Sequence, residues 1–102
     1  MADPYYVPPA PAITSMRRLT FVGQPAVLIS GTEDISGLPS GVSIWISILD
    51  MTRDDNPIGD HGQVNSDGSW QLLVPDYAGD LVFAIATASN GATAQTAPFT
   101  LP

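Results

Sequence analysis

The 102-residue chain contains no cysteine, no lysine and a single histidine, His61. Without cysteine there is no disulfide framework, no thiolate metal site and no thiol redox chemistry. The cations are Arg17, Arg18 and Arg53, against ten acidic residues, which gives a formal net charge of −7. Nucleic-acid binding needs clustered cations that neutralise phosphates, so this composition argues against it.

Long apolar runs are also lacking. The runs around residues 44–49 and 81–88 end at strand length, which excludes a membrane-spanning helix. The first residues lack the basic start and the apolar stretch of a secretion signal. If the chain is the native product, we expect it to stay in the cytoplasm that makes it.

Residues 1–11 are rich in proline and predict an extended N-terminal arm. Tyr5, Tyr6 and Val7 give this arm contact area, and a preordered proline-rich segment loses little entropy when it docks. We therefore expect the arm to lie across a neighbouring subunit or another partner surface. The alternatives are a mobile tail and an arm that folds back over an apolar sheet face of its own domain.

Beyond the arm, residues 12–102 predict one all-β sandwich domain, because short apolar runs alternate with Gly, Pro, Asn and Asp. No segment has a convincing helical stripe. The seven expected strands lie at residues 12–15, 26–32, 42–49, 62–65, 69–74, 81–88 and 92–101.

The strongest local signal is the turn between residues 63–65 and 69–75. A type I turn with a left-handed Gly68 in a bulge sets Val64 opposite Trp70. That register places Val64, Trp70, Leu72 and Val74 on one face, so we favour it over a two-residue turn. Trp70 is then a core residue that fills the space between two sheets.

Alternation along residues 42–49 places Val42, Ile44, Ile46 and Ile48 in the core. In the strand at 81–88 we expect Phe83 and Ile85 to point inward and the smaller residues outward. The resulting outer apolar face would bind a partner, since soluble monomers seldom expose a large apolar patch. Its predicted members are Trp45, Leu49, Val82, Ala84, Ala86, Ala88 and Ala94.

The acidic loop at 50–62 raises the question of Ca²⁺ binding. It lacks the alternate-residue oxygen spacing and the bidentate Glu of a Ca²⁺ loop, and a solvated acidic loop is the simpler interpretation. His61 beside Asp60 lacks the second and third groups that catalysis would need. We therefore expect no catalytic residue, no metal, no cofactor and no enzymatic activity.

Four turn and core motifs occur in order: Gly31-Thr32, Asp67-Gly68-Ser69-Trp70, Tyr77-Ala78-Gly79-Asp80 and Asn90-Gly91. This order resembles the bacterial Ig-like domains, over about residues 12–101. The resemblance implies an antiparallel sandwich with Greek-key connections, in which strands three, six and seven share a sheet. Such domains usually occur as tandem repeats with a threonine-rich outer face on strand six. The single copy and the alanine-rich strand here both favour a partner surface.

The resemblance leads us to expect a non-enzymatic structural protein, most concretely a capsid decoration (cement) protein of a bacteriophage. Such a protein would be assembled into the virion in the host cytoplasm. Its partner would be a capsid or other virion protein, with homo-oligomerisation left open and no nucleic acid or membrane partner. The alternative is a glycan-binding or adhesion module from a larger bacterial surface protein, with the acidic loop beside Trp45 at its site.

Overall fold

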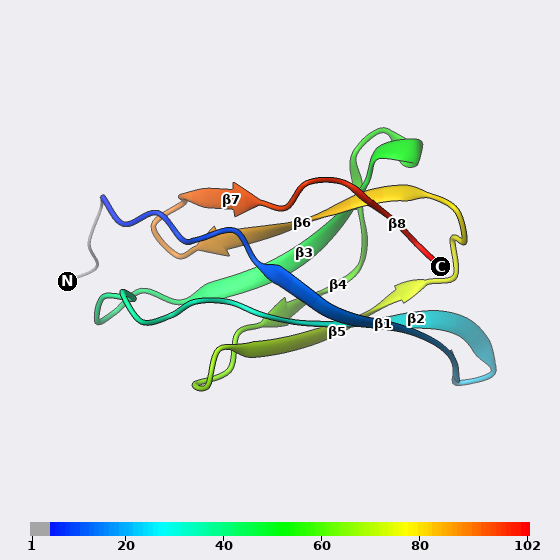
Figure 1. The fold of residues 1–102 in the computed structure, drawn as a ribbon, viewed down its shortest axis with the longest axis horizontal. Coiled ribbons are helices and arrows are strands. Elements are labelled where there is room, and N and C mark those ends of the chain that lie inside the picture. Colours follow the sequence, from blue (N-terminus) through cyan, green and yellow to red (C-terminus); the bar gives the residue numbers. More distant parts are fainter. Residues whose placement is uncertain (1–4) are drawn as a thin grey trace.

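The computed structural model describes residues 5–102, which form two antiparallel β-sheets packed as a sandwich (Figure 1). The smaller sheet has the order β1-β2-β5, with bounds Ala12–Phe21, Gln24–Thr32 and Ser69–Pro75. The larger sheet has the order β4-β3-β6-β7, with bounds Asn56–Gln63, Ile44–Asp50, Leu81–Ala88 and Thr93–Gln95. A short β8, Phe99–Thr100, also pairs with β6.

The chain changes sheet between β2 and β3, between β4 and β5, and again between β5 and β6. The fold is therefore the Ig-like antiparallel β-sandwich with Greek-key connections that the sequence predicts. The expected sharing of one sheet by residues 42–49, 81–88 and 92–101 is confirmed. Apart from the 3₁₀ turn η1, Met51–Arg53, residues 5–102 contain no helix.

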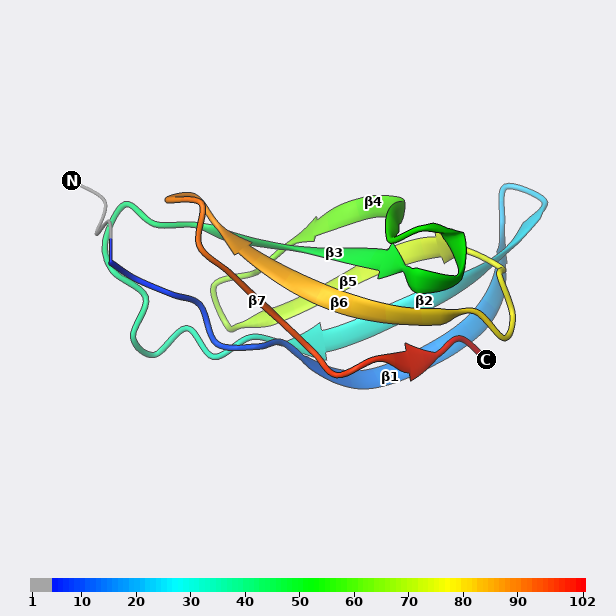
Figure 2. The same cartoon turned by 90° about the horizontal axis from the view of Figure 1, so that it is seen from above.

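Strand β4 begins at Asn56, six residues before the predicted start, so most of the expected acidic loop is strand. Two glycines let β4 lie against β5, as seen in Figure 2. A Cβ on Gly59 would collide with the Leu73 carbonyl oxygen, and one on Gly62 would lie 2.8 Å from that of Gln71. This close backbone approach depends on tertiary structure and leaves little pattern in the sequence.

The turn before β5 has the predicted geometry. The Gly68 N–H donates to the Asn65 carbonyl at 2.9 Å, the Asn65 N–H donates to the Ser69 carbonyl at 2.9 Å, and Gly68 has φ of +87°. These are the bonds of a type I turn with a glycine bulge, so the predicted bulged turn is confirmed, although Val64 lies outside both strands. The turn joins the two sheets, because β4 pairs with β3 whereas β5 pairs with β2.

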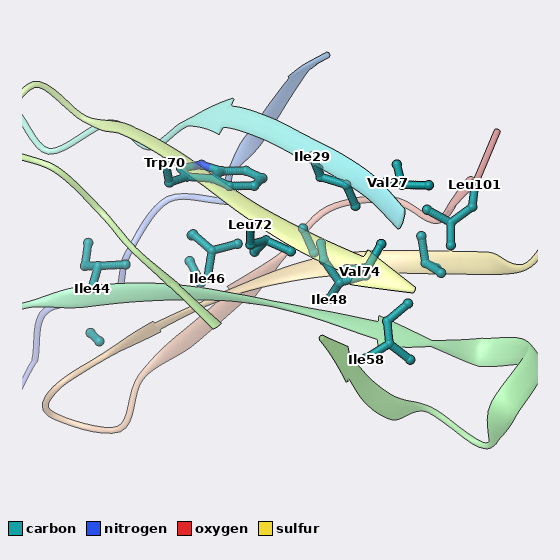
Figure 3. Close-up of a cluster of buried hydrophobic side chains, with 14 of the residues drawn as sticks. Val27, Ile29, Ile44, Ile46, Ile48, Ile58, Trp70, Leu72, Val74 and Leu101 are labelled. Carbon is teal, nitrogen blue, oxygen red and sulfur yellow. The ribbon is translucent and has the colours of Figure 1, made fainter. Parts of the chain in front are cut away.

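The core lies between the sheets. Figure 3 shows the side chains of Ile46 and Ile48 on β3 pointing toward Leu72 and Val74 on β5. Trp70 is only 2% exposed and lies over this layer. The predicted core face of residues 42–48 is confirmed, since its four apolar members are all buried.

The predicted orientation of β6 is wrong. Its small residues face the core and are fully buried: Val82, Ala84, Ala86 and Ala88 each have 0% exposure. Ile46 pairs with Ala86 and Ile48 with Ala84, and directly paired residues of an antiparallel sheet share a face. Ala94 pairs with Ala86 and therefore also turns to the inner side. The alanines fit opposite the bulky isoleucines, so side-chain volume rather than apolar character decides which side faces inward.

A pair of aspartate substitutions tests this orientation. Ala86→Asp buries a charge without a partner and should lower the free energy of unfolding by roughly 3 to 5 kcal/mol. Thr87→Asp, one residue along on the outer face, should cost less than about 1 kcal/mol. Urea denaturation of both variants makes the comparison, and equal losses would contradict the observed register.

Candidate interaction surface

The outer face of the larger sheet carries large apolar side chains. On β3, Trp45 and Leu49 are half-buried, and on β6 Ile85 is half-buried while Phe83 is 9% exposed. Leu49 pairs directly with Phe83, which places both on one side of the sheet. Further along β6, the 39% exposed Leu81 continues the face. We call Trp45, Leu49, Leu81, Phe83 and Ile85 the outer apolar face.

This face keeps two predicted partner-binding residues, Trp45 and Leu49, and replaces the other five. Phe83 and Ile85 stand where small residues were expected, so the face is bulkier than the sequence suggested. The period-two pattern of β6 is apolar on both sides, and periodicity alone cannot orient such a strand. Only its register against β3 reveals which residues face outward.

The arm packs on its own domain from Tyr6 onward. Pro8 and Pro11 are buried, and the Asn90 side-chain amide donates to the Tyr6 carbonyl at 2.9 Å. Figure 1 shows the arm running between β7 and the segment that follows β2. Residues 6–11 thus dock within the chain, and the expected contact of the arm with a neighbour stays a prediction. Tyr5 and Val7 remain 89% and 62% exposed.

A group of charged residues joins η1 to the connection between β5 and β6. The Arg53 Nε donates to Asp80 Oδ2 at 2.9 Å, lies 3.6 Å from Asp50 Oδ2, and places the guanidinium 3.5 Å from the Tyr77 ring centroid. Asp50 is fully buried, and its Oδ1 accepts the Thr52 N–H at 2.9 Å. We call this group the Arg53 corner.

Burial raises the pKa of Asp50, whereas a hydrogen bond from the Asp50 carboxyl lowers the pKa of Asp80. Asp50 Oδ2 has no hydrogen-bond partner among the described groups. The ionised Asp80 then pairs with Arg53. These contacts hold two connections together.

The remaining acids of the expected loop do not converge. Asp54 and Asp55 are exposed, with φ of +61° and +57°, and Asp60 lies on β4. Among residues 5–102, no three acidic or histidine side chains are grouped to hold a metal ion. The loop follows Asp50, whereas Trp45 lies near the other end of β3 and pairs with Gln63. Asp54 and Asp55 therefore lie away from Trp45, whereas Gly62, at the end of the expected loop, pairs with the neighbouring Ile46.

A groove of about 670 Å³ lies on the other outer face, over β2 and β5 and beside β4. Its apolar lining includes Leu28 and Leu73, which pair across these strands. Polar lining groups come from Gln24, Gln71, Asp60 and His61, and the half-exposed Phe21 ring borders one end. The sequence gives no signal for this groove, because the groove requires β4 to lie beside β5.

The hairpin tip next to the groove has an unusual backbone. Phe21 pairs with Gln24, so Val22 and Gly23 form a two-residue turn with φ of +50° and +76°. A β-branched residue rarely adopts positive φ, and Val22 is also 84% exposed. The tip therefore presents apolar side chains on a strained turn.

Comparison of the chain with protein-family models, with curated proteins and with solved structures gave no match. The described part of the chain has no helix long and apolar enough to cross a membrane. The geometry thus defines an Ig-like β-sandwich with two distinct outer faces, one broadly apolar and one grooved.

Replacing the central cation tests the Arg53 corner. Arg53→Met leaves the buried Asp50 without its neighbouring positive charge and should cost about 1 to 3 kcal/mol, a range reduced for the partial exposure of Arg53. Arg17→Met, at an exposed position of β1, should change stability by less than about 0.5 kcal/mol. Thermal and urea unfolding would measure both, and similar losses would show that the corner adds nothing.

Proposed function

We propose that this protein is a non-enzymatic structural protein of the bacterial Ig-like type that decorates the capsid of a bacteriophage. The observation that carries the proposal is the outer apolar face of the larger sheet, on which Leu81 is exposed, Phe83 is buried and the other three members are half-buried. Four turn motifs that resemble bacterial Ig-like domains support the choice of a virus particle, because such particles commonly display these domains. Fold alone does not assign a function, so the proposal rests mainly on the outer apolar face.

The composition of the face suits protein contact. It holds one tryptophan and three large aliphatic residues around Phe83, and the strand pairing keeps these side chains on one side of the sheet. Interfaces concentrate their binding energy in aromatic anchors surrounded by contacts that exclude water. Trp45 is half-buried and retains surface for a partner, so we assign it the anchor role.

The exposed part of the arm would add a second contact. Tyr5 and Val7 point to solvent beside a segment that its own domain already holds. A pre-positioned segment loses less entropy on binding than a free tail. The arm and the outer apolar face would therefore act together on a capsid subunit.

The central test is Trp45→Glu. The change places a charge on the outer apolar face while leaving the core intact, so it should weaken binding to purified capsids at least about 30-fold, as expected for loss of a 2 kcal/mol anchor. Co-sedimentation measures the binding, and light scattering reports self-association. Gln71→Glu, in the groove of the smaller sheet, is the matched control and should bind normally. Unchanged binding by Trp45→Glu would remove this face from the interface.

The groove supports one alternative function, a glycan-binding module. Amide, carboxylate and imidazole groups can bond to sugar hydroxyls, and the Phe21 ring offers an apolar surface for a sugar face.

The alternative uses the other side of the sandwich, so the two functions can be separated. If the protein binds glycans, Phe21→Ala should abolish retention on a glycan array, whereas Trp45→Glu should leave it unchanged. Loss of capsid binding by Trp45→Glu, with normal capsid binding by Phe21→Ala, would favour the decoration role. An array without any retained glycan would reject the alternative.

A further inference from the structure

Glu33 is a buried acid that lacks bonding partners. It follows β2, is 3% exposed, and neither carboxyl oxygen has a hydrogen-bond partner. Its backbone is fixed, because its N–H donates to the Gly68 carbonyl at 2.7 Å and a Cβ on Gly68 would lie 2.6 Å from the Glu33 carbonyl oxygen. The Glu33 backbone therefore has little freedom to carry the side chain out to solvent.

The arm lies next to this acid. Tyr6 packs against the core, and its hydroxyl is likewise buried without a hydrogen-bond partner. Burial raises the pKa of Tyr6, and the negative charges of Glu33 and Asp34 raise it further. The N-terminal arm and the segment after β2 thus meet around two polar groups that have no hydrogen-bond partners.

The surroundings of Glu33 favour its neutral form. Burial, with a smaller contribution from the charge of Asp34, raises the pKa of Glu33 to about 7. The titratable groups of the adjoining segments are Tyr6 on the arm, Asp34 beside it in the chain, and Asp67 in the turn, whose carboxylate is held by Ser69. None of these is a cation, so ionised Glu33 would be a buried anion without a counter-charge.

Among the segments near Glu33, the arm is the one with the fewest backbone constraints. Residues 6–11 belong to no strand, and Pro8, Pro9 and Pro11 have no N–H to donate. The hydrogen bond from Asn90 to the Tyr6 carbonyl is one specific tie between the arm and the domain. The neighbouring β2 and β5, by contrast, are joined in a continuous antiparallel ladder.

We propose that Glu33 is a proton-controlled latch for the N-terminal arm: the arm docks over the neutral acid and leaves when the carboxylate forms and draws in water. Release would expose Tyr6 and Pro8 next to the already exposed Tyr5 and Val7, which would enlarge the contact area of the arm. The proposal concerns the isolated chain, so it stands or falls independently of the capsid role.

The direction of the effect follows from proton linkage. The docked state holds the Glu33 proton more tightly than an open state with an ordinary glutamate, so docking is strongest at acidic pH, weakens as pH rises from 4.5 to about 7, and then levels off. The difference between 4.5 and about 7 corresponds to at most about a 300-fold weakening of docking across this range. Within this window, a modest pH change alters the fraction of chains with a released arm.

The test is an NMR titration of the full, isotopically labelled chain from pH 3.5 to 9. The Glu33 side-chain carbonyl carbon reports ionisation, and the ¹H–¹⁵N heteronuclear NOE of the Val7 and Ala10 amides reports arm order. We expect the carboxyl to titrate near pH 7 and the NOE of both amides to fall with the same midpoint. A carboxyl that titrates near 4.5, or an arm equally ordered from pH 3.5 to 9, would overturn the latch.

Two variants separate the latch from a general effect of pH. Glu33→Gln removes the charge and should keep the arm ordered up to pH 9, whereas a wild-type-like transition in this variant would reject Glu33 as its origin. Asp34→Asn is the matched control: it keeps the latch but removes a like charge, so the midpoint should move to lower pH. Circular dichroism verifies folding, and if Glu33→Gln does not fold, the wild-type titration and the Asp34→Asn shift still decide.

Discussion

The packing of Trp70 against Gly31 is the contact on which the rest of the sandwich depends. The two residues pair across β5 and β2, and any Cβ on Gly31 would collide with the indole ring and with the Ala12 carbonyl oxygen. The ring can lie over β2 only because that side chain is missing. The bulged turn at Gly68 then sets which face of β5 carries the indole, so one turn and one glycine position the largest side chain of the core.

Volume complementarity within this core also shapes the surface. The isoleucines of β3 occupy the space between the sheets, which leaves room for only small side chains at Ala84 and Ala86 on β6. The larger Phe83 and Ile85 must then point outward. An apolar outer face is therefore coupled to the tight packing inside, and the proposed partner contact would use this face.

The two buried carboxyl groups have different environments. Asp50 has the Thr52 amide, the Asp80 carboxyl and the Arg53 guanidinium around it, so its corner is a stable joint between two connections. Glu33 has no such partners and lies beside an arm that belongs to no sheet. Burying a charge is costly unless it is paired. Asp50 has partners that offset this cost, whereas Glu33 has none, and this difference is the basis of the proposed proton-controlled latch.

The sequence by itself determined the all-β class, the bulged turn at Gly68, the core face of β3 and the core position of Trp70. These are local properties, because alternation and turn chemistry act over a few residues. It did not determine the orientation of β6, whose two sides are both apolar, or the place of β4, which depends on Gly59 and Gly62 against β5. It also did not show that the arm docks beside Glu33. Those features were decided by tertiary structure, because register, volume and burial arise only when segments distant in sequence are packed together.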